Sequence, residues 1–217
     1  MSKRIVVMRT DKIENESIVG RPAEAVSDFM ADQPPLAYHA ALRAVAGCTA
    51  RTARLLSQRR LRLPRGRVGM RLHFADGTSA KVYRETAVDR RGPVLDPCVL
   101  VVEFKLRAVR GGGHAAFRVE SLLNTPLFAG FPGFVSKLWL AHDERGRYRG
   151  VYEWDGPGLA GDYARALWRI LALVSVRGSI HYVVLPGLHR DALVEGAHRL
   201  ADAPADTSAW WLLVGAG

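Results

Sequence analysis

Aromatic and charged side chains gather in the stretch FPGFVSKLWLAHDERGRYRGVYEWDG, residues 131–156. Alternating side chains on either side of the turn segment DERG predict a β-hairpin. Aromatic residues on a hairpin form either a packed sheet face or the wall of a ligand pocket. An apolar pocket with a few polar groups is sufficient for chemistry on a bound small molecule.

Strict alternation assigns the residues of this hairpin to two faces. If His142 pairs with Tyr148, then Leu138 lies opposite Tyr152. Trp154 falls on the same face by parity. We expect this to be the apolar face that helices cover, and we expect Tyr152, Trp154 and Leu138 to bind the substrate.

The same register directs Lys137, Trp139 and Glu153 to the opposite face. A cross-strand pair of Lys137 with Glu153 could be solvated, buried at a subunit interface or part of a pocket. Such a pair contributes only about 0.2–1 kcal/mol. We expect these three residues to serve assembly rather than chemistry.

Polar groups for the pocket are expected from outside the hairpin. Asn124 lies near the end of a helix predicted before the hairpin, and His181 alternates with Ile180 and Tyr182 on the last predicted strand. A helix cap or turn is the structural alternative for Asn124, and a hydrogen-bonded structural histidine is the alternative for His181. We take His181 and Asn124 as the candidate catalytic residues.

The elements that position these residues follow from the pattern of apolar residues. From Cys98 the chain is predicted as strand, helix, hairpin, helix and strand, which is the β-α-β-β-α-β order of a ferredoxin-like split βαβ fold. The helix after the hairpin has apolar residues at helical spacing over 159–174. The fold class is α+β. Because such a sheet has helices on one face only, we expect a homodimer that covers the other face.

Residues 1–97 are predicted to extend this main domain of residues 98–217. Alanine, leucine and arginine favour a helix over residues 36–60. Two alternating segments within residues 68–88 flank an Asp-Gly pair, which is a strong hairpin turn signal. An isolated hairpin is marginally stable, so we expect the extension to pack on the main domain.

Composition limits the possible functions. The chain has 217 residues, of which 48% are hydrophobic and 24% charged, a typical globular balance. No apolar run reaches the roughly 18 residues of a membrane span, and no signal peptide is evident, so a cytoplasmic protein without a membrane partner is expected. The two cysteines and the absence of Walker A, GxGxxG, HExxH and GxSxG motifs disfavour metal, nucleotide and serine-hydrolase chemistry.

The formal net charge is +10, and its densest basic cluster is residues 51–67. This cluster could be a solvated helix end and linker, a site for an anionic ligand or partner, or a surface for nucleic acid. No nucleic-acid-binding motif accompanies it, so a nucleic-acid partner is not expected.

Residues 98–190 resemble the YdhR-like branch of the dimeric α/β-barrel proteins, which are relatives of the antibiotic-biosynthesis monooxygenases. The resemblance lies in the segments LVVEFKL, FPGFVSKLW and RGVYEWDGPGLAGDYARAL. The residues that match the pattern of this family are Pro132, Gly133, Lys137, Trp139, Gly150, Tyr152 and Tyr163. It implies homodimers whose sheets meet face to face, with a ligand cavity between sheet and helices in each subunit. Some relatives oxidise polyphenolic substrates with dioxygen and no cofactor.

We therefore expect a small-molecule enzyme that acts on an aromatic or polyketide-like substrate in an apolar cavity, as a cofactor-independent monooxygenase. A cyclase or isomerase could use the same cavity without dioxygen, because proximity alone contributes about 7–11 kcal/mol. A non-catalytic ligand-binding protein is the third possibility. No cofactor is expected in any of these cases.

Overall fold

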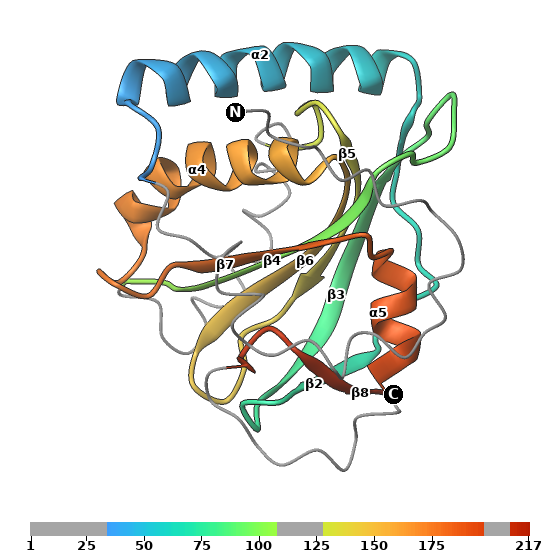
Figure 1. Cartoon of the computed structure of the whole chain (residues 1–217), viewed down its shortest axis with the longest axis vertical. Helices are drawn as coiled ribbons and strands as arrows, with labels where there is room; N and C mark the ends of the chain where they lie inside the picture. The colour runs from blue at the N-terminus through green and yellow to red at the C-terminus, as the bar shows by residue number, and fades with distance from the viewer. Residues whose placement is uncertain (1–33, 108–127, 198–208) are drawn as a thin grey trace, which may run out of the picture.

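The structure is a computed structural model that describes residues 34–107, 128–197 and 209–217 (Figure 1). Its helices are α2 (Tyr38–Ser57), α4 (Pro157–Val174) and α5 (Arg190–Gly196). Its strands are β1 (Leu61–Arg62), β2 (Arg71–Phe74), β3 (Ser79–Val88), β4 (Pro97–Lys105), β5 (Phe134–Leu140), β6 (Arg147–Asp155), β7 (His181–Pro186) and β8 (Leu213–Ala216). Within the described ranges, no helix is both long enough and apolar enough to cross a membrane.

The strands form one curled antiparallel sheet in the order β7-β4-β6-β5-β3-β2-β8, with β1 paired to β3. The four strands β7-β4-β6-β5, with α4 between β6 and β7, have the order expected of a ferredoxin-like sheet. The fold is thus mixed α/β, in agreement with the sequence analysis. The helix predicted between β4 and β5, which would carry Asn124, falls outside the described residues.

The N-terminal hairpin continues this sheet. β2 pairs with β3 around the predicted turn, where Gly77 has a φ of 78° that favours glycine. The Asp76 carboxylate accepts hydrogen bonds from the backbone N–H and the hydroxyl of Thr78, at 3.1 and 2.6 Å. β3 then pairs along the edge of β5, from Val82 to Ala87. The hairpin predicted within residues 68–88 is therefore part of the main sheet.

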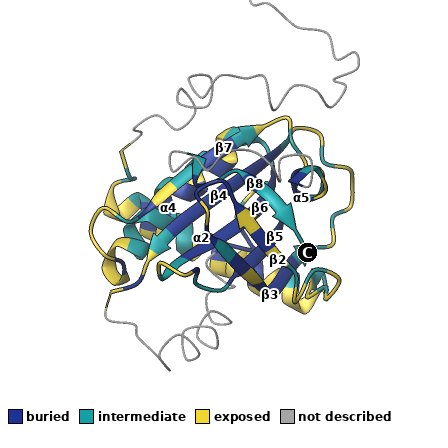
Figure 2. Ribbon diagram, turned by 90° about the horizontal axis from the view of Figure 1, so that it is seen from below, coloured by how far each residue is buried: buried dark blue, intermediate teal, exposed yellow. Residues whose placement is uncertain are grey.

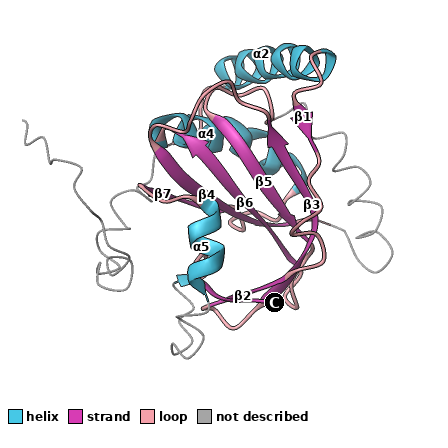
Figure 3. Cartoon of the chain, turned by 90° about the vertical axis from the view of Figure 1, so that its right-hand side faces the viewer, coloured by secondary structure: helices cyan, strands magenta, loops and turns pink. Residues whose placement is uncertain are grey.

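The first core lies between the sheet and α4, and α2 lies across α4 on the side away from the sheet (Figures 1 and 3). α4 begins at Pro157, where proline fits the first turn of a helix. Ala160 and Ala164 are buried on α4, and their small size lets the helix approach the strands. The Arg169 guanidinium of α4 donates a 2.7 Å hydrogen bond to the carbonyl of Leu36, which anchors the start of α2.

The second core covers the opposite face of the sheet. Val99, Val101, Val151 and Val183 on this face have no solvent exposure. α5, β2, β8 and the Trp210 side chain cover them, and Figure 2 shows the central strands buried. The sequence predicted a dimer interface on this face. The predicted location of the interface is wrong, because the chain covers the face itself. The homodimer stays a prediction.

A buried ion network closes one end of the second core. The Arg149 guanidinium lies 2.7 Å from the Asp76 carboxylate, 2.5 Å from Glu103 and 3.3 Å from Asp143. All four side chains are almost completely excluded from solvent. Because Asp76 belongs to the N-terminal hairpin and Glu103 to β4, this one guanidinium ties the hairpin to the main sheet.

Replacing Arg149 with Met should therefore destabilise the protein strongly. Removing one partner of a buried ion network leaves uncompensated charges and typically costs about 3–5 kcal/mol. Urea unfolding followed by circular dichroism measures the loss. The matched control is Arg145→Met, since the Arg145 side chain contacts the same Asp76 carboxylate but is 47% exposed. We expect about 0–1 kcal/mol for the control. Equal losses in both variants would contradict the role given to Arg149.

We propose that residues 1–97 do not fold as a separable unit. A fragment of residues 95–217 lacks β3 and β2, so the edge of β5 and the second core would be exposed. We expect this fragment to aggregate or to unfold without a cooperative transition when heated. A soluble fragment with the stability of the full chain would refute the proposal.

Candidate functional site

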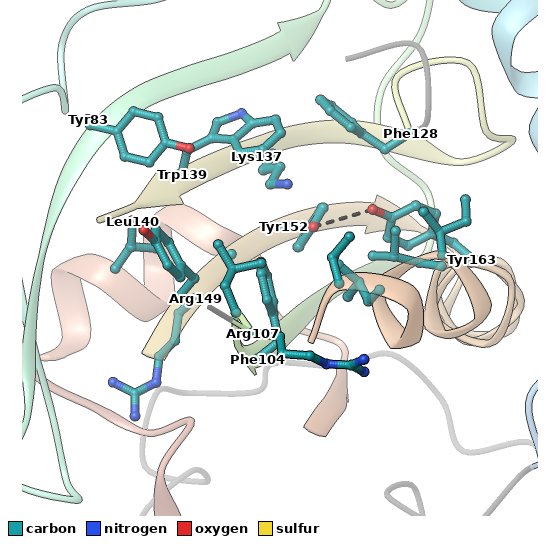
Figure 4. Close-up of a pocket in the computed structure, with 17 residues that line it drawn as sticks. Tyr83, Phe104, Arg107, Phe128, Lys137, Trp139, Leu140, Arg149, Tyr152 and Tyr163 are labelled. Atoms are coloured by element: carbon teal, nitrogen blue, oxygen red, sulfur yellow. Dashed lines mark hydrogen bonds between the residues drawn. The ribbon is translucent and has the colours of Figure 1, made fainter. Parts of the chain in front are cut away.

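A cavity of about 350 Å³ lies in the first core, between the sheet and α4 (Figure 4). Its walls are mostly aromatic and aliphatic, from β3, β4, β5, β6, α4 and the residue Phe128. This volume is at the lower end of the range for small-molecule sites. The position agrees with the predicted cavity between sheet and helix.

The pairing of β5 with β6 differs from the predicted register by one residue. Lys137 lies opposite Tyr152, and Trp139 lies opposite Gly150. Lys137, Trp139 and Tyr152 therefore share the cavity face, and the prediction that Lys137 and Trp139 point away from it is wrong. The predicted pair of Lys137 with Glu153 is also wrong, because Glu153 faces the other side.

An irregularity near the turn causes this shift. Asp143 still pairs with Arg147 through a 2.9 Å backbone hydrogen bond, as the predicted register requires. Between Asp143 and Trp139, however, the β5 side has one residue more than the β6 side. The backbone N–H of Ala141 donates instead to Lys81 of β3, at 2.8 Å. A one-residue slip moves every following side chain to the other face.

Lys137 is the chemically distinctive residue of the cavity. It is only 6% exposed, and its Nζ lies 3.2 Å from the ring centre of Trp139, 4.5 Å from that of Tyr152 and 4.8 Å from that of Phe128. Figure 4 shows the amine pointing into the space between these three rings. Lys137 forms no salt bridge with any residue that the structure describes.

Gly150 makes room for this arrangement. A Cβ at this position would come within 2.7 Å of the Tyr152 ring and 3.2 Å of the Lys137 Cε. Gly150 itself lines the cavity.

Burial lowers the pKa of Lys137 well below its ordinary value, because the ammonium form loses its hydration. The positive charge of Arg84 lowers it further. The three aromatic rings attract the cation and offset part of this effect, at about 0.5–2 kcal/mol for such contacts. We expect the loss of hydration to dominate, so that a larger fraction of the amine is neutral and available as a base than in an exposed lysine.

Trp139 is held in place from several sides. Its indole N–H donates a 3.1 Å hydrogen bond to the Thr86 hydroxyl. The Arg84 guanidinium carbon lies 4.0 Å from the centre of its ring, and Phe128 packs edge-on at 5.1 Å. The ring nearest to the Lys137 amine is thus fixed before any ligand binds.

Two tyrosines supply hydroxyl groups to the cavity. The Tyr163 hydroxyl donates a 3.3 Å hydrogen bond to the Tyr152 hydroxyl, which leaves the Tyr152 O–H free to donate to a ligand. Burial raises the pKa of both side chains above the ordinary tyrosine value. Both therefore stay protonated at neutral pH and act as donors rather than bases.

The predicted site residues are not brought together. Of the described ones, only Tyr152 lines the cavity. Trp154 lies on the same face but is fully buried against Tyr163, with ring centres 4.8 Å apart. Leu138 belongs to the second core. His181 is exposed on that same far side, where its ring lies 6.1 Å from that of Trp210.

Sequence reasoning missed Lys137 and Trp139 as cavity residues. One available signal was a lone lysine within the apolar strand FVSKLWL. β5 is a central strand, where a lysine side chain is buried.

No known protein-family model and no curated protein matches the chain. Two solved structures resemble it at 14% identity over 52% of its length. One is an uncharacterized ferredoxin-fold protein related to antibiotic biosynthesis monooxygenases from Listeria monocytogenes, matched over 66% of its own chain with a TM-score of 0.36. The other is an anthrone oxidase-like protein, matched over 55% of its chain with a TM-score of 0.34.

Replacing Lys137 with Met should stabilise the protein at neutral pH. The native state holds Lys137 with a lowered pKa, so at neutral pH the unfolded chain binds more protons at this residue than the native state, and this difference favours unfolding. Methionine has a similar shape and no such cost. The gain should shrink as the pH rises toward about 10.4, where the unfolded lysine also loses its proton.

Chemical unfolding of wild type and variant at a series of pH values measures this difference. Lys81→Met, at an exposed lysine of β3, is the control and should show no such trend. A Lys137→Met variant that is less stable at neutral pH, with a gap that does not depend on pH, would show that the amine is charged in the native state.

Proposed function

We propose that this chain is a small-molecule enzyme that binds a flat aromatic or polyketide-like substrate in the cavity and uses the neutral amine of Lys137 as its general base. The observation that carries the proposal is a buried lysine that has no carboxylate partner among the described residues, inside an aromatic cavity large enough for a small ligand. A structural lysine would gain more from an ion pair or from water.

The cavity walls favour a flat ligand. Phe128, Trp139 and Tyr152 surround the amine and offer ring faces and edges for stacking. The Tyr152 hydroxyl can donate a hydrogen bond to a carbonyl or phenolic oxygen of the substrate. These contacts would hold an acidic O–H or C–H of the substrate beside the Lys137 amine.

Proton transfer to Lys137 then creates an ammonium ion beside a substrate anion. The two charges stabilise each other strongly in an apolar site, and the aromatic rings add cation–π attraction. This pairing makes the bound substrate a stronger acid, which favours the proton transfer. A base with a pKa lowered toward the working pH is efficient in such a step.

For a monooxygenase, the substrate anion would react with dioxygen. In the net reaction a CH₂ group becomes a carbonyl, one oxygen atom enters the product and the other leaves as water. The substrate supplies all the electrons, so no cofactor is required. A cyclase or isomerase would return the proton from Lys137 to another atom of the substrate without using dioxygen.

The proton-transfer step can be tested with 4-nitro-1-naphthol, whose phenol and phenolate forms have different visible spectra. At a pH where the free probe is mostly protonated, binding to the wild-type protein should produce the phenolate spectrum. Lys137→Met should bind the probe in its neutral form, and Lys81→Met should behave as wild type. Identical spectra for wild type and Lys137→Met, or no binding to either, would refute the proposal.

Tyr152→Phe tests the hydroxyl contact without changing the volume of the cavity. Loss of one hydrogen bond should weaken probe binding by about 0.5–1.5 kcal/mol while the phenolate spectrum persists. Turnover is then measured on hydroxylated polyaromatic compounds under air and under argon. Product formation only in air indicates an oxygenase, equal formation in both indicates a cyclase or isomerase, and binding without turnover indicates a ligand-binding protein.

A further inference from the structure

A second hollow borders the segment of residues 128–134. It is a groove of about 550 Å³ between the end of α2, the residues that follow β3, and this segment. Phe128 lines the cavity, whereas residues 129–132 line the groove. The proposed function does not use this groove.

Five arginines line the groove, and they come from three places in the chain. Arg51 and Arg54 lie on α2, Arg60 follows this helix, and Arg90 and Arg91 follow β3. Among the residues that the structure describes, no aspartate or glutamate lines the groove. The fold thus gathers part of the basic cluster of residues 51–67 with two arginines that are distant in sequence.

The charges of these arginines are only partly compensated. Arg90 forms a short salt bridge with Asp155, and the Arg60 guanidinium donates a 2.9 Å hydrogen bond to the backbone carbonyl of Asp89. Arg51, Arg54 and Arg91 form no salt bridge within the described part of the chain.

Guanidinium groups stay protonated at any physiological pH. The groove therefore has a strongly positive potential that an anion would relieve.

The backbone of the groove is closely fitted. A Cβ on Gly130 would collide with the Cys48 carbonyl oxygen of α2, so only glycine allows the helix to pack this closely on the 128–134 segment. This contact fixes the distance between the arginines of α2 and the floor of the groove. Leu55, Val88 and Phe131 give the groove an apolar portion next to its charges.

We propose that this groove binds a small organic molecule with a diphosphate or triphosphate group. Phosphate oxygens match the paired N–H donors of arginine, and several phosphates can neutralise several guanidinium groups at once. The apolar portion next to Phe131 would accept the organic part of the ligand. The arginines converge on one hollow rather than follow a long stripe, which favours a small molecule over nucleic acid.

Isothermal titration with inorganic pyrophosphate, inorganic triphosphate and ADP tests the proposal. Wild type should bind triphosphate more tightly than pyrophosphate, and ADP more tightly than pyrophosphate because of its organic part. The double variant Arg51→Gln/Arg54→Gln should weaken binding by about tenfold or more, and Arg91→Gln should also weaken it. The control is Arg43→Gln/Arg65→Gln, which removes the same charge at exposed positions outside the groove.

Thermal unfolding of each variant verifies that it is folded. Equal loss of affinity in the control and the groove variant would reduce the effect to general charge attraction and overturn the proposal. Absence of binding to wild type would also overturn it. Tighter binding to single-stranded oligonucleotides as they become longer would assign the groove to nucleic acid instead. Binding of 4-nitro-1-naphthol should be unchanged in the groove variants, so this test is independent of the proposed function.

Discussion

Both faces of the sheet are covered within one chain, so a charged side chain in the middle of its central strands is shielded from bulk water. Such a charge has to be compensated inside the protein or be neutral. The second core follows this constraint closely. Arg149 is surrounded by three carboxylates, Glu85 lies 2.7 Å from Arg190 of α5, and Glu153 lies 2.7 Å from His189. These ion pairs connect the strands of the sheet to the hairpin and to α5, the elements that cover the second core.

Lys137 is under the same constraint and meets it differently. On the first-core side, aromatic rings rather than carboxylates surround the amine. Rings attract a cation but do not neutralise it, and burial lowers the pKa of the amine. The two faces of one sheet therefore have different chemical characters. One is held together by buried ion pairs, whereas the other holds a lysine amine among aromatic rings, and in the proposed function the charge of this amine changes when a ligand enters.

Local signals in the sequence predicted much of the fold. The Asp-Gly turn, the apolar spacing of α4 and the alternating strands all correspond to observed elements, and Tyr152 lines the observed cavity. The register of β5 on β6 could not be predicted, because it depends on a hydrogen bond from Ala141 to β3, far away in sequence. That one-residue slip decides the placement of Lys137 and Leu138. The covering of the second face was also missed, since α5, Trp210 and β8 reach it only through long-range packing.

The position of β8 has a consequence for how the protein is made. β8 pairs with β2, with Leu72 opposite Ala216, and Leu213 is part of the second core. While the ribosome extends the chain, β2 through β7 are complete before their cover of α5, Trp210 and β8 has been synthesised. The valines of the second face are apolar surface during this interval, and such surface promotes aggregation of nascent chains. Covering of the second core also depends on contacts between distant parts of the chain, and such contacts slow folding. Newly made chains of this protein are therefore expected to depend on chaperones until the segment from residue 190 to residue 216 has left the ribosome.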